Sequence, residues 1–335
     1  MSNTNHKPDE TSGMISRRRF LGTTAAAAAA YTAMPLVTLG GPRAGVRRRD
    51  MNGVQVGAIS YSFRELPSSA EEVLGYLVQL GLDTVELMGN TAEQFAGAPE
   101  GPAWPRRGAQ LSEEERAKLR AEREAYAREV RKWRLSAPMD RFEALRKMYN
   151  DEGVQIDILK LGSPEWTDEE IDYAFRAARA VGARGISFEI SNEAAERMGP
   201  FATKHKMYVG MHNHTQVADE GFSFDVPLSF SPYNMLNFDI GHYVAGLNTS
   251  PIPVLRKYHD RITHLHLKDR KMGTNGGDNL PWGQGDTPLR EVLQLLRKEQ
   301  WPISAMIELE YQIPNGSDVL TEMAKCVDFC RDALA

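Results

Sequence analysis

The sequence predicts an α/β fold in which eight parallel strands, each followed by a helix, close into one (β/α)₈ barrel. Two observations favour this fold. From residue 54 onward, short β-branched or apolar runs alternate with longer amphipathic stretches, and there are eight such runs. Polar residues also gather where the runs end, as they do on the catalytic face of a barrel. The length of 335 residues alone fits two ordinary domains as well as one barrel.

The elements follow in a regular order along the chain. The expected strands are Val54–Phe63, Thr84–Met88, Val154–Leu161, Gly185–Ile190, Met207–His212, Met235–Ile240, Ile262–Leu267 and Ser304–Leu309. Apolar residues spaced three and four apart predict helices between the strands, among them Ala70–Leu80, Thr167–Val181, Pro253–Tyr258 and Leu289–Glu299.

An insertion after strand two interrupts this order. Residues 97–140 open with Gly and Pro and continue as the highly charged stretch Ser112–Arg134. Glu, Arg and Lys at i, i+4 spacing are typical of a solvated helix. The alternative is a lid over the barrel mouth, because insertions after barrel strands fall on the catalytic face.

The first 45 residues read as a targeting segment, and residues 46–335 as the barrel. A basic stretch, Ser16-Arg17-Arg18-Arg19-Phe20-Leu21, precedes an Ala-rich apolar run. It resembles the twin-arginine export signal, which implies the twin-arginine translocase as a partner and a periplasmic or otherwise exported location. An ordinary secretory signal or a membrane anchor is the alternative. We expect the mature chain to begin near Gly40 to Val46.

Composition narrows the classes of partner. The chain carries 40 Lys and Arg against 45 Asp and Glu, a net charge of −5, which argues against a nucleic-acid surface. Its two cysteines, Cys326 and Cys330, lie at i, i+4 spacing in the last predicted helix. That spacing is tight for a disulfide, so we interpret them as small core residues. No feature decides the oligomeric state.

Side chains suited to chemistry cluster at the ends of strands four to eight. Five of the eight histidines lie there, together with several carboxylates, and in a barrel these strand ends converge on one point. A purely structural cluster is the alternative to a metal site. Mixed nitrogen and oxygen ligands suit one divalent ion of Mn, Co, Fe, Ni or Zn better than Ca²⁺. The residues concerned are Glu189, His212, His214, Asp239, His242, His264, His266, Lys268, Glu308 and Glu310.

Strand alternation sorts these residues, because side chains two apart share one face of a strand. His264, His266 and Lys268 are expected to point inward together. Glu308 is expected to lie deeper than Glu310 on a shared face. Asp239 has a second interpretation as a helix-capping or turn residue before Gly241.

The pattern resembles the sugar phosphate isomerase/epimerase superfamily of xylose isomerase-like barrels over residues 54–335. The motifs that carry the resemblance are Asp239-Ile-Gly-His242, His264-Leu-His266-Leu-Lys268-Asp269, Pro281-Trp-Gly-Gln-Gly285-Asp286 and Ile307-Glu308. Ketose 3-epimerases of this superfamily hold one metal through residues on strands five to eight. The resemblance implies Asp239, His266 and Glu308 as ligands and His242 as a contact to substrate.

Strand five departs from the superfamily pattern. His212 stands where the epimerases have a glutamate, so one carboxylate of their acid/base pair is missing. Either His212 or Glu189 then completes the ligand set. Apurinic endonucleases share the barrel but carry histidines on early strands, whereas strands two and three here offer Glu86, Asp157 and Lys160.

The resemblance implies a metal-dependent isomerase or epimerase that moves a proton α to the carbonyl of a sugar or polyol. The catalytic candidates are Glu308, Glu189, His242 and Lys268; Lys268 as a salt-bridge partner of Asp269 or Asp239 is the alternative. The substrate-binding candidates are Tyr61, Glu86, His214 and Trp282. A lyase or dehydratase acting on a keto-inositol or 3-keto-glycoside, or a non-catalytic periplasmic sugar-binding protein, are the alternative functions.

Overall fold

The computed structural model describes residues 51–102 and 110–335. The targeting segment expected at residues 1–45, and the boundary placed after it, lie outside these ranges. Within them, every helix is too short or too polar to cross a bilayer.

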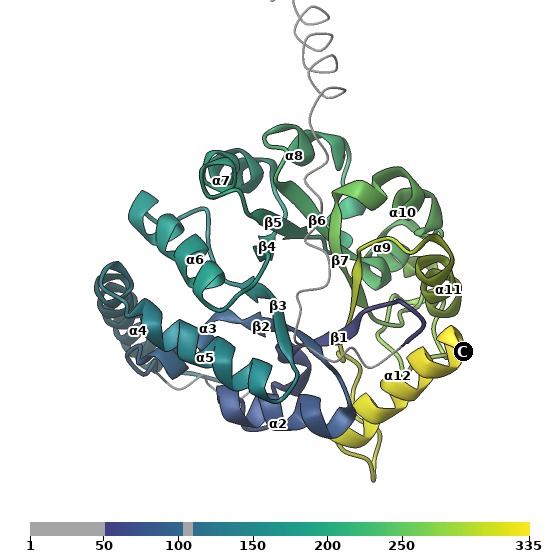
Figure 1. Ribbon diagram of the computed structural model, residues 1–335, viewed down its shortest axis with the longest axis horizontal. Coiled ribbons are helices and arrows are strands. Elements are labelled where there is room, and N and C mark those ends of the chain that lie inside the picture. Colours follow the sequence, from purple (N-terminus) through teal and green to yellow (C-terminus); the bar gives the residue numbers. More distant parts are fainter. Residues whose placement is uncertain (1–50, 103–109) are drawn as a thin grey trace, which may run out of the picture. The chain divides into compact units, whose positions relative to one another are not determined.

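Eight parallel strands close into a barrel in chain order, with β8 pairing to β1, and helices surround them (Figure 1). The predicted fold is therefore confirmed. The strands are β1 Val56–Ile59, β2 Thr84–Met88, β3 Gln155–Lys160, β4 Gly185–Glu189, β5 Tyr208–His212, β6 Asn234–Asp239, β7 Ile262–Leu267 and β8 Ser304–Ile307.

The helices begin where side chains supply capping groups. Thr167 and Glu170, for example, form a capping box that starts α6, so this helix begins one residue later than the sequence predicted. The helices are α2 Ala70–Leu80, α3 Gly89–Ala96, α4 Glu113–Leu135, α5 Met139–Asp151, α6 Asp168–Ala180, α7 Asn192–His205, α8 Asp225–Ser229, α9 Ile240–Leu247, α10 Ile252–Tyr258, α11 Leu289–Glu299 and α12 Val319–Leu334.

The first and last strands end earlier than predicted. Residues Ser60–Phe63 form a 3₁₀ turn instead of extending β1, and β8 ends at Ile307. Serine side chains explain both ends. The Ser62 hydroxyl donates to the Ile307 carbonyl oxygen and accepts from the Leu309 amide, each over 3.0 Å, replacing ladder hydrogen bonds between the strands.

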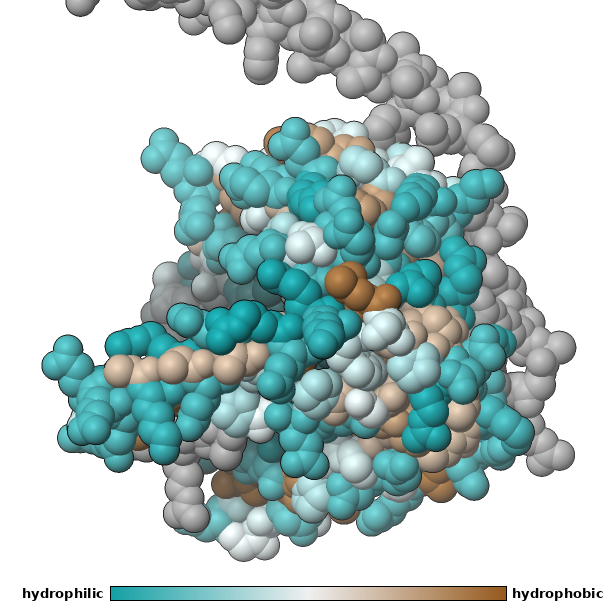
Figure 2. All heavy atoms as spheres, turned by 90° about the vertical axis from the view of Figure 1, so that its left-hand side faces the viewer, coloured by the Kyte–Doolittle hydropathy of each residue, from teal (hydrophilic) through white to brown (hydrophobic). Residues whose placement is uncertain are grey.

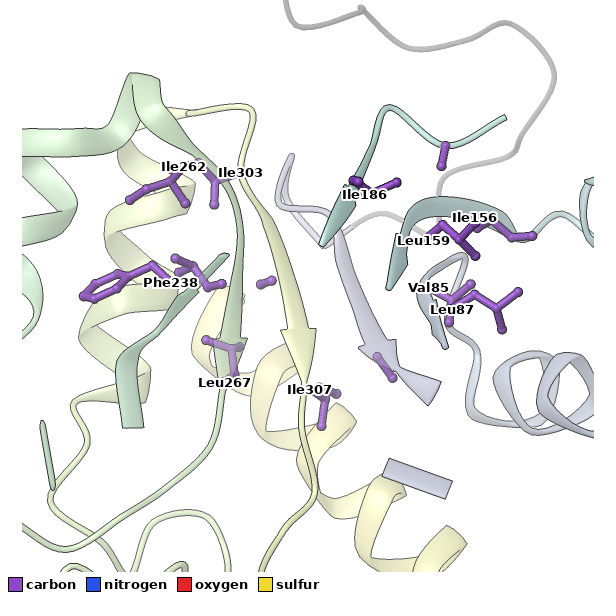
Figure 3. Packing of buried hydrophobic residues seen from close by; sticks show 14 of the residues in the cluster. Val85, Leu87, Ile156, Leu159, Ile186, Phe238, Ile262, Leu267, Ile303 and Ile307 are labelled. Atoms are coloured by element: carbon purple, nitrogen blue, oxygen red, sulfur yellow. The ribbon is translucent and has the colours of Figure 1, made fainter. Parts of the chain in front are cut away.

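The barrel core lies between the strands and the helices. Val85 and Leu87 on β2 pack beside Ile156 and Leu159 on β3, as Figure 3 shows, and all four are buried. Since alternate residues point to opposite faces, the intervening Glu86 points into the barrel. Cys326 and Cys330 are buried and free, which agrees with their interpretation as core residues.

The insertion contains α4, whose surface is mostly exposed, and Val130 is the one residue of this helix that is buried. Arg134 ties its last turn to Glu93 on α3 and Glu170 on α6, at 2.7 and 3.3 Å. The face of the molecule that includes this helix is largely hydrophilic (Figure 2). These contacts favour the solvated helix over the lid.

Candidate metal centre

Four side chains converge inside the barrel, each from the carboxyl end of a different strand among β5 to β8. His212, Asp239 and His266 are the inward-facing residues at or near the ends of β5, β6 and β7, and Glu308 directly follows β8. All four are at most 5 % exposed, and each offers a ligand atom within 4.8 Å of the others.

Asp239 serves two purposes in this cluster. Its Oδ1 accepts from the His242 amide over 2.7 Å and caps α9. Its Oδ2 faces the cluster, 3.3 Å from Nε2 of His212 and 3.9 Å from Nδ1 of His266. The capping interpretation and the ligand interpretation therefore describe different oxygens of one carboxylate.

Two atoms of the cluster, Nδ1 of His266 and Oε2 of Glu308, lie 2.8 Å apart, and Lys268 Nζ lies 2.9 Å from the same carboxylate oxygen. Buried polar atoms of opposite charge thus crowd at one point among the residues that the structure describes. A shared cation fits such a point. Two imidazoles and two carboxylates are a donor set for Mn, Fe, Co, Ni or Zn rather than Ca²⁺. The residues present thus fit a divalent ion.

Lys268 brings a buried positive charge to the same point. Its Nζ lies 3.0 Å from Asp239, 2.9 Å from Glu308 and 2.6 Å from Glu310, and the residue is 2 % exposed. Burial by itself lowers the pKa of this amine, but the three carboxylates raise it above its usual range. The ammonium is therefore charged and fixed beside the ligands.

Asp269 points the other way, as alternation predicts, so Lys268 pairs with Asp239 and not with Asp269. The Asp269 carboxylate accepts from the backbone amides of Gly283 and Gly285 over 2.8 and 2.9 Å. A Cβ on Gly285 would lie 2.0 Å from Asp269 Oδ1, which explains the glycine. Asp269 thereby holds the loop that carries Trp282.

His242 lies between two cations at the edge of the cluster. Lys268 Nζ is 3.1 Å from its Nε2, and an Arg270 guanidinium nitrogen is 2.5 Å from its Nδ1. Burial lowers the pKa of His242 to about 3, and Lys268 contributes although Asp239 opposes the shift. This imidazole is therefore neutral near pH 7.

A second group of polar residues lies toward the barrel mouth. The half-exposed Glu189 carboxylate accepts from Lys160 Nζ over 3.0 Å, from His214 Nε2 over 2.7 Å and from His212 Nδ1 over 3.1 Å. Burial raises the pKa of Glu189, but its bonds to His212 and His214 lower it below the usual range. Glu189 thus reaches the ring nitrogen of His212 that faces away from Asp239.

The structure places the expected substrate contacts at different depths. Tyr61, in the 3₁₀ turn after β1, is 39 % exposed, and His214 is exposed beside Glu189. Trp282 is half-buried, and its ring meets Phe329 of α12 edge-on at 5.5 Å. Glu86 is fully buried and lies 2.5 Å from Nε2 of His266.

The sequence reasoning overlooked several residues that contact this site. Arg270 directly follows the motif that carries Lys268, and its contact with His242 depends on the turn after β7. Ser187 and Asn237 were passed over, although each lies two residues before a singled-out carboxylate and so shares its face. Alternation alone would have included both.

The fold and the site together define a (β/α)₈ barrel protein with side chains of the metal-ligand type gathered at the carboxyl ends of its strands. Residues 74–330 match the model of the xylose isomerase-like TIM barrel family, and the chain belongs to that family. The expected family membership is thus confirmed. No curated protein sequence matches the chain.

Several solved structures share the fold. A sugar phosphate isomerase/epimerase from Parabacteroides distasonis is 16 % identical, with a TM-score of 0.54 over 88 % of this chain and 97 % of the other. A probable 3-DHS dehydratase from Bacillus anthracis is 14 % identical, with a TM-score of 0.55 over 82 % and 99 %. The 3-keto-D-glucoside 4-epimerase from E. coli is 12 % identical, with a TM-score of 0.52 over 83 % and 99 %.

Proposed function

We propose that this protein is a metal-dependent isomerase or epimerase that transfers a proton α to the carbonyl of a sugar or polyol. The observation that carries the proposal is the convergence of four buried ligand side chains at the ends of β5 to β8, beside the fixed ammonium of Lys268. His212, Asp239, His266 and Glu308 would hold one divalent ion. When bound, such an ion polarises a carbonyl and its neighbouring hydroxyl.

The residues around this point have distinct roles in the proposal. Glu308 takes the α-proton, since its carboxylate belongs to the ligand cluster and is held ionised by Lys268. Lys268 binds the oxygen on which negative charge develops, and neutral His242 donates to or accepts from a substrate hydroxyl. Glu189 and His214 lie nearer the barrel mouth, and they return or remove a proton on the face of the substrate opposite Glu308.

The remaining side chains position the substrate. Tyr61 and Trp282 offer aromatic surface to a sugar ring, and His214 offers a polar contact. The chain's relatives in fold include an E. coli 3-keto-D-glucoside 4-epimerase and a D-psicose 3-epimerase by name, which supports a sugar as substrate.

A lyase or dehydratase is the second candidate function, and one observation favours it. His212 stands where a carboxylate would lie on β5, so Glu308 is the one carboxylate of the four-residue cluster that does not also cap a helix. One base suffices for elimination, in which a second group protonates the leaving oxygen, whereas epimerisation needs proton transfer on two faces. A probable 3-DHS dehydratase shares the fold.

Elemental analysis of residues 46–335, purified without chelator, tests the proposal. We expect about one Mn, Co, Fe, Ni or Zn ion per chain, lost in Glu308→Gln and kept in the control Glu220→Gln, which changes an exposed carboxylate. Keto-sugars incubated in deuterated water would then exchange their α-protons. Recovery of an epimer or isomer supports the first function, and release of an unsaturated product the second. Absence of metal from the wild-type protein would instead favour a sugar-binding protein without catalysis.

We also propose that the protein is exported by the twin-arginine translocase, on the strength of the Arg17-Arg18 pair in the leading segment. Replacing both arginines with lysine keeps the charge but removes the recognised pair. The full chain should then accumulate in the cytoplasm, as cell fractionation would show. Unchanged export of this variant would contradict the proposal.

A further inference from the structure

Glu86 is a carboxylate on β2 with no exposed surface. An isolated charge in such a place is strongly unfavourable, so a buried glutamate must be paired and hydrogen-bonded. The side chains that contact Glu86 therefore account for its place in the barrel.

Those partners surround both carboxylate oxygens. Oε2 lies 2.5 Å from Nε2 of His266 and 3.2 Å from Nε2 of His264. Ser187 donates its hydroxyl to Oε1. The side-chain amide of Asn237 lies 3.1 Å from the same nitrogen of His266. Glu86 is thus held by residues from β4 and β7 and contacts one ligand of the cluster directly.

The His266 ring links Glu86 to the candidate metal position. Its Nε2 faces Glu86, while its Nδ1 faces Glu308 and Asp239, at 2.8 and 3.9 Å. A neutral imidazole carries its proton on one nitrogen, and the partner of that nitrogen decides which one. A carboxylate that accepts from Nε2–H leaves the Nδ1 lone pair directed at the cluster.

We propose that Glu86 is a positioning residue: it fixes the orientation and tautomer of His266 so that Nδ1 is presented to the metal. The proposal rests on the proposed function of the cluster as a metal centre. Carboxylates that accept from the free nitrogen of a ligating histidine typically change metal affinity 10- to 100-fold when removed.

Glu189 provides an internal comparison, since it contacts the other ligand histidine in the same way. Its carboxylate accepts from Nδ1 of His212 over 3.1 Å, but its side chain is 55 % exposed. Water can replace an exposed acceptor, whereas no solvent reaches Glu86. We therefore expect Glu86 to contribute more to metal affinity than Glu189.

The test measures metal affinity and metal geometry rather than turnover. Zn²⁺ and Co²⁺ affinities of the full chain are determined by competition with a chelating dye, and the visible absorption of the Co²⁺ form reports ligand geometry. The variants are Glu86→Gln, which keeps an acceptor but loses the charge, Glu86→Leu, which loses both, and Ser187→Ala. Glu189→Gln is the matched control. Thermal unfolding of the metal-free proteins identifies variants with an altered fold.

Glu86→Leu should bind Zn²⁺ about 100-fold more weakly, and Glu86→Gln about 10-fold more weakly with an altered Co²⁺ spectrum. Ser187→Ala should follow in the same direction by a smaller factor, and Glu189→Gln should weaken binding less than Glu86→Gln. If Glu86→Leu does not fold, Glu86→Gln and Ser187→Ala still decide the question. Folded variants with wild-type affinity and spectrum would overturn the positioning role alone. A wild-type protein that binds neither ion would overturn the metal centre, and this role with it.

Discussion

The two halves of the barrel contribute differently to the site. Strands β5 to β8 supply every member of the four-residue cluster and also Lys268. Strands β2 to β4 supply Glu86 and Glu189, which contact ligand histidines of the cluster, and Ser187 and Lys160, which contact those two carboxylates. The β5 to β8 half therefore carries the groups that would hold the metal, and the β2 to β4 half carries carboxylates that contact two of those groups.

Burial separates the halves as well. Lys268 and its partner Asp239 are 2 % and 0 % exposed as side chains, whereas Lys160 and its partner Glu189 are 19 % and 55 % exposed. Electrostatic interactions strengthen as water is excluded. The same kind of ion pair should thus matter more on the β5 to β8 side.

Replacing a ligand should have the largest effect. Asp239→Asn keeps an oxygen that can cap α9 but loses the charge beside His212 and Lys268. We expect metal affinity to fall by at least about 100-fold, beyond the loss typical of outer contacts, and proton exchange to disappear. Dye competition and exchange in deuterated water measure both. A variant that keeps metal and activity would show that the β5 to β8 half does not form the centre.

The sequence predicted the β5 to β8 half of the site well because the patterns that mark it lie within single strands and short motifs. Strand alternation placed His266 and Lys268 inward and Glu308 deeper than Glu310, and the motif order indicated the family. It could not show which nitrogen of His212 faces Asp239, or that Glu189 takes the other one. Those facts depend on side-chain rotamers and on the register between strands. Alternation likewise gives the inward face of Glu86 but not the contact of its carboxylate with His266.

The next effect should be on the stability of the metal-free protein. Lys268→Met leaves Asp239 and Glu308 buried without their cation, at an expected cost of about 3 kcal/mol in the free energy of unfolding. Lys160→Met, on the other side, should cost at most about 1 kcal/mol, because Glu189 is solvated. Urea denaturation compares the two variants. A saturating divalent ion should restore much of the stability that Lys268→Met loses. Equal losses of stability in Lys268→Met and Lys160→Met would contradict the difference between the two halves of the barrel.

A smaller effect should appear in the pH dependence of metal-free stability. Burial raises the pKa of Glu86, but His264 and His266 lower it well below the usual range; burial lowers the pKa of His266, but Glu308 and Glu86 raise it to about 10. A lowered carboxyl pKa stabilises the fold above the unfolded value of about 4.3, and this stability is lost as pH falls. A raised histidine pKa stabilises below about 6.5, and this is lost as pH rises toward 10.

Stability of the metal-free protein should therefore decline on both sides of a maximum between about pH 5 and 6.5. Glu86→Gln removes one charge of the pair and should flatten both limbs, by on the order of 2 kcal/mol. Urea denaturation at several pH values measures this. Limbs that are as steep in Glu86→Gln as in the wild type would assign the dependence to other groups.

The smallest effect should come from the inserted helix α4, which adjoins the β2 to β4 half. Arg131 pairs with Glu170 over 3.0 Å, but its side chain is 53 % exposed, so Arg131→Met should change the free energy of unfolding by at most about 1 kcal/mol. Because α4 packs on α3 and α6 outside the barrel, metal affinity and proton exchange should stay at wild-type values. A changed rate of substrate proton exchange at unchanged stability would instead favour the interpretation of α4 as a lid. A helix that only packs on the outer ring of helices has no physical route to the reacting atoms.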